Sequence, residues 1–310
     1  MESDGSVRGW RRSPMVKIRI PASTSNLGPG FDCLGLAFSI YNTFDISLSD
    51  HDELVNVEEQ YNNPDNLFLK AYHAAGQYCG CDDHIRAVFD CAIPVSRGLG
   101  SSASLTCGGI SAYALLHEGK LTGQEALELS TRLEGHPDNA APALFGGLTA
   151  SINEGSVMTQ KMPLSPDWIY TLYIPDVEVS TAEARRALPD AYSRQIAVTN
   201  SAHAILLTKA LADGDLELLK TASVDHIHEP YRKAFIPHFD EVKALAVKDT
   251  GGVFLISGSG STCISISLSH LSQAVRDALN AYEEKWHIME TRPAFQGAGY
   301  FKEETWHPIF

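Results

Sequence analysis

A short segment rich in glycine and serine, IPVSRGLGSSAS at residues 93–104, contains residue types that suit phosphate binding. The lysine that follows the last glycine of a Walker-type loop is missing. Backbone N–H groups at the start of a helix, together with the helix dipole, nevertheless bind phosphate without a lysine. Gly98 and Gly100 allow a close approach of the backbone, and Ser101 and Ser102 add hydroxyl groups, one of which can reach a metal ion. By itself, the segment is equally consistent with a glycine turn that begins an ordinary helix.

Two further glycine-rich segments change that balance. The segment PASTSNLGPGFDCLGLAF, at residues 21–38, follows an apparent strand, and FLISGSGSTCISIS, at residues 254–267, lies between apparent strands. Each segment alone is consistent with a turn. The three together, in this order and with these contents, favour a phosphate-binding function.

The elements that must position these segments are a mixture of strands and helices. Alternating apolar residues predict strands over Val16–Ile20, where Pro21 ends the pattern, and over Leu36–Leu48, Ile85–Ile93, 146–152 and 168–175, with a β-hairpin around 257–261. Helical spacing predicts helices over Asn66–Tyr78, Ser101–His117, Gly123–Leu133, Ala182–Leu188, Ser193–Asp213, Asp215–Ala222 and Phe239–Asp249. Thr122 and Glu125 form a capping box at the start of the third helix. A further helix and strand are expected to finish the chain.

This order of elements lacks a strict strand–helix alternation and therefore predicts an α+β fold. Helical patterns dominate after about residue 160, so we expect an N-terminal ATP-binding lobe at 15–160 and a C-terminal α+β lobe at 161–310, with the chemistry between them. Residues 1–14 match neither a helix nor a strand and are interpreted as a leader or a disordered extension.

Composition limits the partners. The chain has 310 residues and a formal net charge of −14, which disfavours nucleic acid and anionic membranes. No apolar run approaches the roughly 20 residues of a bilayer span. The six cysteines are expected to be reduced and to act as small buried apolar side chains in a cytoplasmic protein: Cys33, Cys79, Cys81, Cys91, Cys107 and Cys263. The spacing of Cys79 and Cys81 is not that of a usual zinc site.

The three glycine-rich segments resemble the three motifs of the GHMP kinase superfamily, and their sequences are most similar to the homoserine kinase branch. The resemblance extends from about Met15 to the C-terminus and includes three further stretches, EGHPDNAAPALFGG at 134–147, STAEARRALP at 180–189 and HEPYR at 228–232. One departure is Ser261, where the family more often has proline.

The resemblance implies a two-lobed GHMP kinase fold with a left-handed βαβ crossover at the phosphate loop. It also implies an ATP-dependent kinase that phosphorylates the hydroxyl of L-homoserine in threonine biosynthesis, and a homodimer. Backbone amides of the loop would surround the ATP phosphates, and the loop comprises Pro94, Val95, Ser96, Arg97, Gly98, Leu99, Gly100, Ser101, Ser102, Ala103 and Ser104. Glu134 and Ser102 would hold Mg²⁺, which prefers oxygen ligands.

The same resemblance assigns the acceptor end of the pocket. Arg185 and Arg232 would bind the substrate carboxylate, and Asp32 would bind its ammonium group. Asn26, His136 and Thr181 would order the pocket, although Thr181 also suits a helix cap. Arg186 and Arg194 are assigned to the solvated face.

Asn139 stands where several relatives carry an aspartate that acts as a base. An amide is not a useful base near neutral pH, so Asn139 is expected to align the hydroxyl, with Glu134 and Arg185 as its catalytic companions. Assistance of proton transfer by His136 or by Asp138 stays open, and the alternative role expected for Asp138 is to cap the helix that follows. The spacing of His226, His228 and Glu229 matches no strong zinc motif and indicates a structural role.

Two other functions stay open at this point. The first is a GHMP kinase for another small alcohol, such as mevalonate, which has a carboxylate but no ammonium group for Asp32. The second is a binding protein with this fold that no longer catalyses a reaction. The presence of Gly98, Gly100, Ser102 and Glu134 argues against the second.

Overall fold

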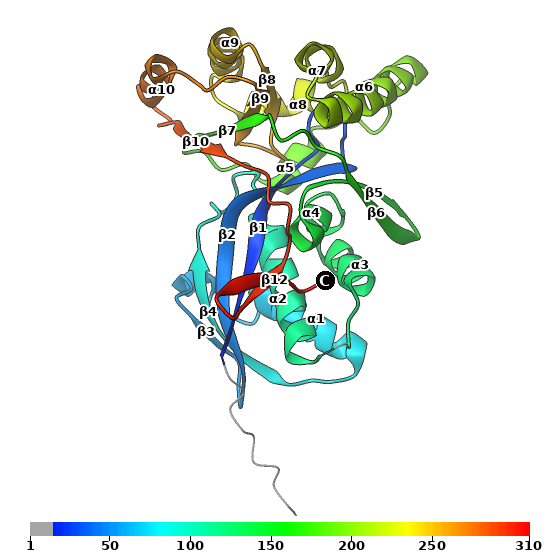
Figure 1. Ribbon diagram of the computed structural model, residues 1–310, viewed down its shortest axis with the longest axis vertical. Helices are drawn as coiled ribbons and strands as arrows, with labels where there is room; N and C mark the ends of the chain where they lie inside the picture. Colours follow the sequence, from blue (N-terminus) through cyan, green and yellow to red (C-terminus); the bar gives the residue numbers. More distant parts are fainter. Residues whose placement is uncertain (1–14, 119) are drawn as a thin grey trace, which may run out of the picture.

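The computed structural model describes residues 15–118 and 120–310 (Figure 1). The leader predicted at residues 1–14 lies outside the described residues. Figure 1 shows two groups of helices, one towards each end of the long axis of the molecule. Both helices and strands contribute throughout, which confirms the α+β class.

Within residues 15–118 and 120–310, the first sheet has eight strands in the order β12-β11-β1-β2-β4-β3, with β5 paired to β2 and β6 to β5. The strands are β1 (Val16–Ser25), β2 (Leu34–Ser49), β3 (Glu53–Val55), β4 (His84–Cys91), β5 (Leu148–Glu154), β6 (Ser156–Met162), β11 (Gly299–Lys302) and β12 (Thr305–Pro308). All pairs are antiparallel except β3 with β4, which helix α1 connects. The handedness of the crossover stays a prediction.

The predicted end of the first strand at Pro21 is wrong. Strand β1 continues to Ser25, and its register with β2 shifts between Pro21 and Ala22. Such an irregularity tolerates a proline, because the residue without an N–H group falls where the ladder is interrupted. The extension matters for the site, since it carries β1 to the first glycine-rich segment.

Four helices cover one side of this sheet: α1 (Leu67–Cys79), α2 (Ser101–Leu116), α3 (Gly123–Glu134) and α4 (Ala140–Phe145). Phe44 of β2, Phe68 of α1 and Phe89 of β4 form an aromatic cluster with ring centres 4.8 to 5.2 Å apart. The capping box of Thr122 and Glu125 is confirmed. Asn66 accepts hydrogen bonds from the N–H groups of Phe68 and Leu69 and therefore begins α1 as its N-cap.

In the part of the chain that the structure describes, the second sheet has four antiparallel strands in the order β10-β7-β9-β8. They are β7 (Ile169–Ile174), β8 (Val253–Ile256), β9 (Cys263–Ser267) and β10 (His287–Thr291). The helices of this part are α5 (Thr181–Arg186), α6 (Arg194–Asp213), α7 (Leu216–Ala222), α8 (Glu229–Arg232), α9 (Phe239–Thr250) and α10 (Gln273–Asn280), and two short 3₁₀ turns occupy Glu59–Tyr61 and Lys233–Phe235. Strands β8 and β9 confirm the predicted hairpin around residues 257–261.

The division into lobes near residue 160 stays a prediction. Strand β6 crosses that point, and β11 near the end of the chain pairs with β1 in the first sheet. One apolar cluster also joins the two sheets, because Phe38 of β2 packs against Tyr170 of β7 with ring centres 5.6 Å apart.

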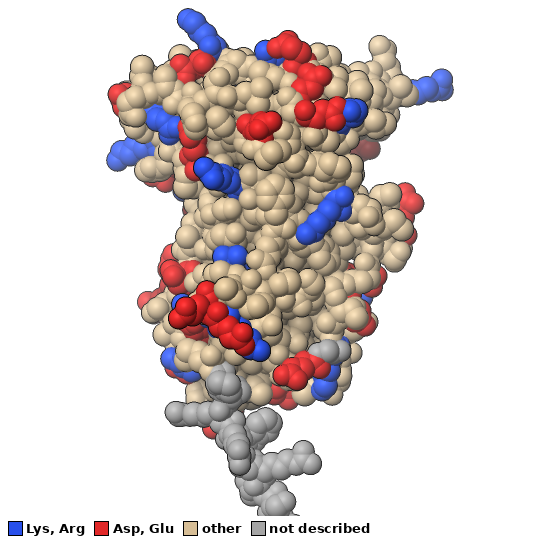
Figure 2. Space-filling model, viewed as in Figure 1, with Lys and Arg blue, Asp and Glu red and all other residues tan. Residues whose placement is uncertain are grey.

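The expectation that all six cysteines are buried is wrong. Cys107 and Cys263 are buried, Cys33, Cys79 and Cys81 are half-buried, and Cys91 is exposed, because it ends β4 at the surface. All six are free thiols. Figure 2 shows acidic side chains gathered towards both ends of the visible face, while its middle is mostly uncharged with a few basic side chains. Within the described residues, no helix has the length and apolar character needed to cross a bilayer.

Candidate active site

The three glycine-rich segments meet in space. The Ser257 hydroxyl donates a hydrogen bond of 2.6 Å to the Gly98 carbonyl, which joins the third segment to the second. The Ser23 N–H group donates to the Leu99 carbonyl at 3.1 Å, which joins the first segment to the second. The Gly258 N–H group donates to the Ser25 carbonyl at 3.2 Å and closes the set. Three segments that are far apart in the sequence thus form one site.

The two loop glycines are required by this packing. Gly98 has φ 75° and Gly100 has φ 68°, both in the left-handed region that favours glycine. A Cβ atom at Gly98 would lie 2.3 Å from the Ser257 carbonyl oxygen, and one at Gly100 would lie 2.2 Å from the Ser23 hydroxyl oxygen. The predicted unusual backbone angles are therefore confirmed, and helix α2 begins directly after them at Ser101.

Two other residues of the predicted loop, Arg97 and Ser104, use their side chains for contacts within the protein. The Ser104 hydroxyl accepts a hydrogen bond from Asn42 and donates to the Ser101 carbonyl. Arg97 pairs with Asp176 at 3.1 Å and with Glu178 at 3.4 Å. The loop from Pro94 through Ala103 to Ser104 stays a predicted ATP site. The contacts of Arg97 and Ser104 fix the position of the loop on either side of Gly98 and Gly100.

The predicted metal pair comes together at the start of α2. The Ser102 hydroxyl donates to Glu134 Oε1 at 2.8 Å, which brings the end of α3 to the first turn of α2. The Thr106 hydroxyl donates to the same oxygen at 2.6 Å. Sequence reasoning missed Thr106, although its place four residues after Ser102 puts both hydroxyl groups on one helix face.

Two residues predicted to bind opposite ends of a substrate bind each other. Arg185 Nη1 and Nη2 each donate to one oxygen of Asp32, both at 2.8 Å. This fork is the strongest geometry that an arginine and a carboxylate form, and it raises the pKa of Arg185. The two side chains are 43% and 35% exposed, so the pair remains within reach of a solute.

Arg232 and Asn26 lie behind this ion pair. Arg232 is 2% exposed, and its Nη1 donates to the Gly258 carbonyl at 3.0 Å. Burial lowers the pKa of Arg232, and nearby Arg185 lowers it further. Asn26 Nδ2 donates to the same carbonyl at 2.9 Å, while Asn26 Oδ1 accepts from the Asp32 N–H group at 3.1 Å. Asn26 therefore orients the segment that carries Asp32.

The Phe31 ring packs against both arginines and against His228. The guanidinium carbons of Arg185 and Arg232 lie 5.5 and 5.0 Å from the centre of the Phe31 ring. His228 stacks on the same ring at 5.5 Å and its Nε2 lies 3.0 Å from the Gly28 carbonyl oxygen. His228 is fully buried, which agrees with the predicted structural role. Phe31 was missed because an aromatic residue beside glycines has no distinctive spacing.

The predicted helix cap by Asp138 is wrong. Helix α4 begins after Asn139 without a side-chain cap, and buried Asp138 instead lies 2.6 Å from His136 Nδ1. This hydrogen bond raises the pKa of His136 against the opposing effect of burial. Asp138 and His136 therefore form a dyad that keeps the imidazole oriented and protonated to higher pH.

Both the oxygen and the nitrogen of the Asn139 side-chain amide form hydrogen bonds with strand β1. Its Oδ1 accepts from the Ser23 hydroxyl at 2.9 Å, and its Nδ2 donates to the Ser25 hydroxyl at 3.0 Å. A Cβ atom at Gly100 would lie 3.2 Å from Asn139 Oδ1, so the amide also adjoins the loop. Its role on a substrate hydroxyl stays a prediction.

The remaining predicted residues lie around these. Ser180, and not Thr181, caps α5, which leaves the Thr181 hydroxyl 3.2 Å from the Ser259 hydroxyl of the third segment. Arg186 and Arg194 are exposed, as predicted. Ser261 is buried and its hydroxyl donates to the Val177 carbonyl, so this departure from the family pattern is accommodated internally.

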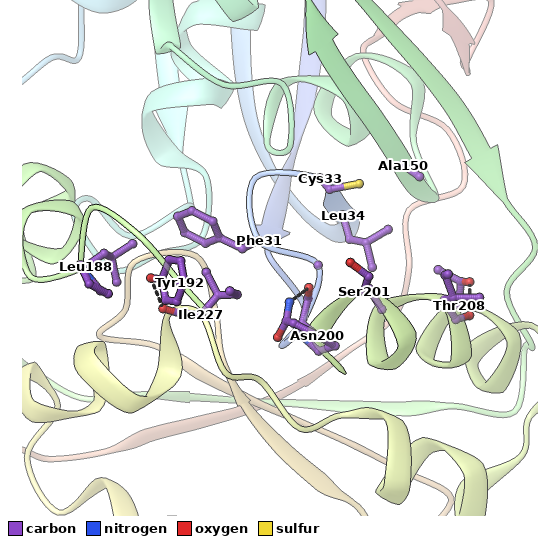
Figure 3. A pocket seen from close by; sticks show the side chains of 15 residues that line it. Phe31, Cys33, Leu34, Ala150, Leu188, Tyr192, Asn200, Ser201, Thr208 and Ile227 are labelled. Carbon is purple, nitrogen blue, oxygen red and sulfur yellow. Dashed lines mark hydrogen bonds between the residues drawn. The ribbon is translucent and has the colours of Figure 1, made fainter. Parts of the chain in front are cut away.

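A cavity of about 580 Å³ adjoins the Phe31 side of the site (Figure 3). Its lining includes Phe31 and Leu34 from the first segment, Tyr192 before α6, and Asn200 and Thr208 of α6. Asn200 Nδ2 donates to the Pro29 carbonyl at 2.8 Å, which ties α6 to the first segment.

Two family models match the chain in the order of its sequence. The GHMP kinases N terminal domain matches residues 66–147, and the GHMP kinases C terminal model matches residues 207–285. The chain is 39% identical over 273 residues to a homoserine kinase of Microchaete diplosiphon, which covers 85% of this chain and 89% of that protein. It is 36% identical to a homoserine kinase of Aquifex aeolicus, with 86% and 93% covered.

Solved structures agree with these relatives. The crystal structure of homoserine kinase from Cytophaga hutchinsonii has a TM-score of 0.83 and 26% identity, with 93% of this chain and 98% of that chain covered. A mevalonate kinase structure has a TM-score of 0.68 at 16% identity, which shows a shared fold. The chain belongs to the GHMP kinases and, within them, to the homoserine kinase family.

Proposed function

We propose that this chain transfers the γ-phosphoryl group of ATP to the hydroxyl of L-homoserine and forms O-phospho-L-homoserine for threonine biosynthesis. The observation that carries this proposal is the ion pair of Asp32 and Arg185, which lies beside the glycine-rich loop segments. An amino acid has one ammonium and one carboxylate group, and these match the two partners. Binding would exchange one ion pair for two, with no charge left unpaired.

The phosphate loop supports ATP as the donor. Positive φ angles at Gly98 and Gly100 leave backbone N–H groups at the start of α2, where the helix dipole favours an anion. Ser102 belongs to this first turn of α2 and donates a hydrogen bond of 2.8 Å to Glu134, so both residues adjoin the start of the helix.

The residues around Glu134 fit Mg²⁺. A carboxylate and a hydroxyl within hydrogen-bonding distance are the hard oxygen donors that this ion accepts in small number from a protein. Glu134 and Ser102 would hold the ion, and Thr106 would orient the carboxylate. When bound, Mg²⁺ neutralises charge on the transferring phosphoryl group.

The transfer itself needs positioning more than a base. The homoserine oxygen forms a bond to the γ-phosphorus, the bond from phosphorus to the β–γ bridging oxygen breaks, and the hydroxyl proton is released. A loose transition state makes little demand on that proton. The neutral amide of Asn139 is not a base that accepts this proton. The raised pKa of His136 favours its protonated form, which donates hydrogen bonds and does not accept a proton.

A mevalonate kinase activity is not favoured, because mevalonate would leave Asp32 without a partner. A non-catalytic protein is not favoured either, because the loop glycines, Ser102 and Glu134 are all in place. Assembly as a homodimer and a cytoplasmic location extend the proposal, and light scattering after size-exclusion chromatography tests the first.

The direct test is ADP release coupled to NADH oxidation, measured with ATP and Mg²⁺ in the presence of L-homoserine, mevalonate or neither. We expect release that depends on homoserine and an O-phosphohomoserine product by mass spectrometry. Faster release with mevalonate would overturn the substrate, and no release with any acceptor would overturn the kinase activity.

A further inference from the structure

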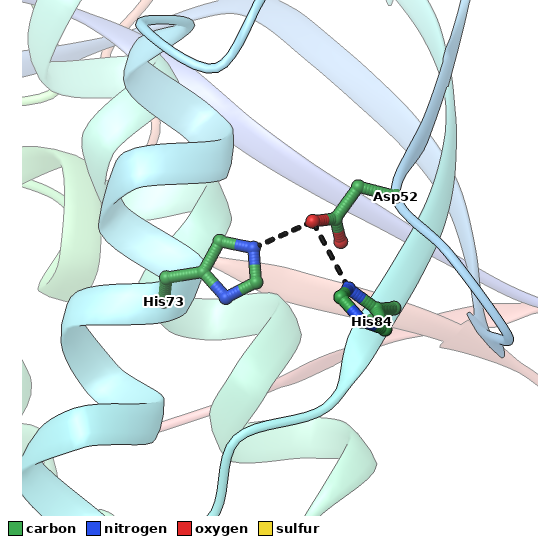
Figure 4. A group of neighbouring side chains, drawn as sticks. All are labelled: Asp52, His73 and His84. Carbon is green, nitrogen blue, oxygen red and sulfur yellow. Dashed lines mark hydrogen bonds and ion pairs between the residues drawn. The ribbon is translucent and has the colours of Figure 1, made fainter.

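A cluster of three side chains with metal-ligand groups lies where a loop, helix α1 and strand β4 of the first sheet meet, away from the active site (Figure 4). Asp52 follows β2 in the chain, His73 is in the middle of α1, and His84 begins β4. One oxygen of Asp52, Oδ2, lies 2.9 Å from His73 Nε2 and 3.1 Å from His84 Nδ1. Figure 4 shows both imidazole rings turned towards this carboxylate.

The donor atoms are close to the spacing that a tetrahedral metal ion requires. Bonds of about 2.0 to 2.2 Å place tetrahedral ligands roughly 3.3 to 3.6 Å apart. All three donor atoms of the cluster lie within 4.8 Å of one another. An ion could therefore replace the shared hydrogen bonds with movements of a few tenths of an ångström on the Asp52 side. The two imidazole planes are 78° apart, so the rings approach from different directions.

The surroundings also resemble a metal site, because outer groups orient the ligands. The second oxygen of Asp52, Oδ1, accepts from the Ile85 N–H group at 3.1 Å, which fixes the carboxylate. The other nitrogen of His73, Nδ1, lies 3.5 Å from Asp82 Oδ1. A carboxylate on the far nitrogen of a ligating histidine fixes its tautomer and increases its basicity.

The exposure of the cluster suits an incoming ion. The side chain of His84 is 51% exposed, whereas His73 and Asp52 are 25% and 24% exposed. The site is therefore held by the fold on one side and open to solvent on the other, where water can supply a fourth ligand.

We propose that Asp52, His73 and His84 form a binding site for a divalent transition-metal ion of the Zn²⁺ class. Two imidazoles and one carboxylate suit Zn²⁺, Ni²⁺ or Cu²⁺ and do not suit Mg²⁺, which prefers oxygen ligands throughout. The site is separate from Glu134. Strand β4 alone places His84 about 23 Å from Cys91, the last strand residue before the phosphate loop, at roughly 3.3 Å per residue. This inference does not depend on the proposed kinase activity.

Such an ion would tie three elements together. Within the cluster, Asp52 of the loop after β2 contacts both His73 of helix α1 and His84 at the start of β4. A bound ion would replace these hydrogen bonds by three coordinate bonds. Metal binding to the folded state raises stability by mass action. The expected consequence is a higher melting temperature with Zn²⁺ than after treatment with a chelator.

The test uses the full chain, stripped with a chelator and dialysed, then titrated with Zn²⁺ against a chromophoric competitor. We expect one equivalent to bind, and Co²⁺ to give the intense visible bands of four-coordinate geometry. His84→Gln and His73→Gln should weaken binding at least tenfold, and Asp82→Asn about tenfold. His51→Gln is the matched control, because His51 is exposed in the same loop and outside the cluster, and it should bind as the wild type does.

The neighbouring group of Cys81, Asp83 and His117 provides the competing site. There, Asp83 already accepts from Tyr72 and pairs with His117, both at 2.8 Å. Zn²⁺ binding that survives His84→Gln, or that disappears in Cys81→Ser, would overturn the proposal, as would no binding by the wild type. If His73→Gln does not fold, histidine NMR of the wild type decides: Zn²⁺ must shift His73 and His84 and leave His117 unchanged.

Discussion

Replacement of Asp32 by asparagine separates the substrate role of its carboxylate from its structural role. Asp32 lies at φ 53°, a conformation that asparagine tolerates well, and its contact with Asn26 uses the backbone N–H group, which the variant keeps. The ion pair with Arg185 is partly exposed, and pairs of this kind contribute at most about 1 kcal/mol to stability. Asp32→Asn should therefore fold and lose little free energy of unfolding.

The expected effect on the substrate is larger. A hydrogen bond to a charged partner contributes about 1.5 to 3 kcal/mol, so loss of the ammonium partner should raise KM for L-homoserine roughly tenfold to 150-fold. KM for ATP should not change. The deamino analogue 4-hydroxybutyrate gives the sharper readout. Because Arg185 is no longer held by Asp32, the variant should use this analogue as well as the wild type does, or up to about fivefold better.

Steady-state ADP release with the two acceptors measures this prediction, and circular dichroism checks the fold. Asp190→Asn is the matched control, because Asp190 is an exposed acid that follows α5. An unchanged KM for homoserine would refute the ammonium role. A parallel increase in KM for homoserine, 4-hydroxybutyrate and ATP would show that Asp32 acts only through the shape of the loop.

Three other predictions follow from the same geometry. Glu134→Gln should lower kcat at least 100-fold with little change in melting temperature, because a charge that stabilises the transition state is lost. The control Glu118→Gln should leave kcat unchanged, and near-normal turnover of Glu134→Gln at saturating Mg²⁺ would show that Glu134 is not a metal ligand. The pH profile of the wild-type kcat should have no acid limb that arises from His136, and an acid limb that vanishes in His136→Gln would instead identify His136 as a base. Because the folded pKa of His136 is raised, its pairing with Asp138 should stabilise the protein below about pH 6.5, and this contribution should be lost as pH rises through the folded pKa. Asn66→Ala should destabilise the protein by about 1 kcal/mol in urea unfolding without changing KM for ATP, because Asn66 caps α1; an increase in that KM would place it at the nucleotide.

The sequence alone determined the class of fold and the family, and the reason is that these depend on local chemistry. Loop glycines need special backbone angles wherever they occur, so Gly98 and Gly100 could be identified before any contact was known. The capping box at Thr122 is equally local, since both partners lie within four residues. The pairing of Ser102 with Glu134 was also expected, but only through the family resemblance.

Tertiary structure decided what each polar group actually contacts, because a side chain chooses among partners that sequence distance does not reveal. Asp138 was expected to cap a helix, yet burial beside His136 offered a stronger partner. Asp32 and Arg185 are 153 residues apart, and nothing local indicates that they neutralise each other. The same holds for Asp52, which meets His73 and His84 only because β4 returns beside β2 and brings three separate elements to one carboxylate.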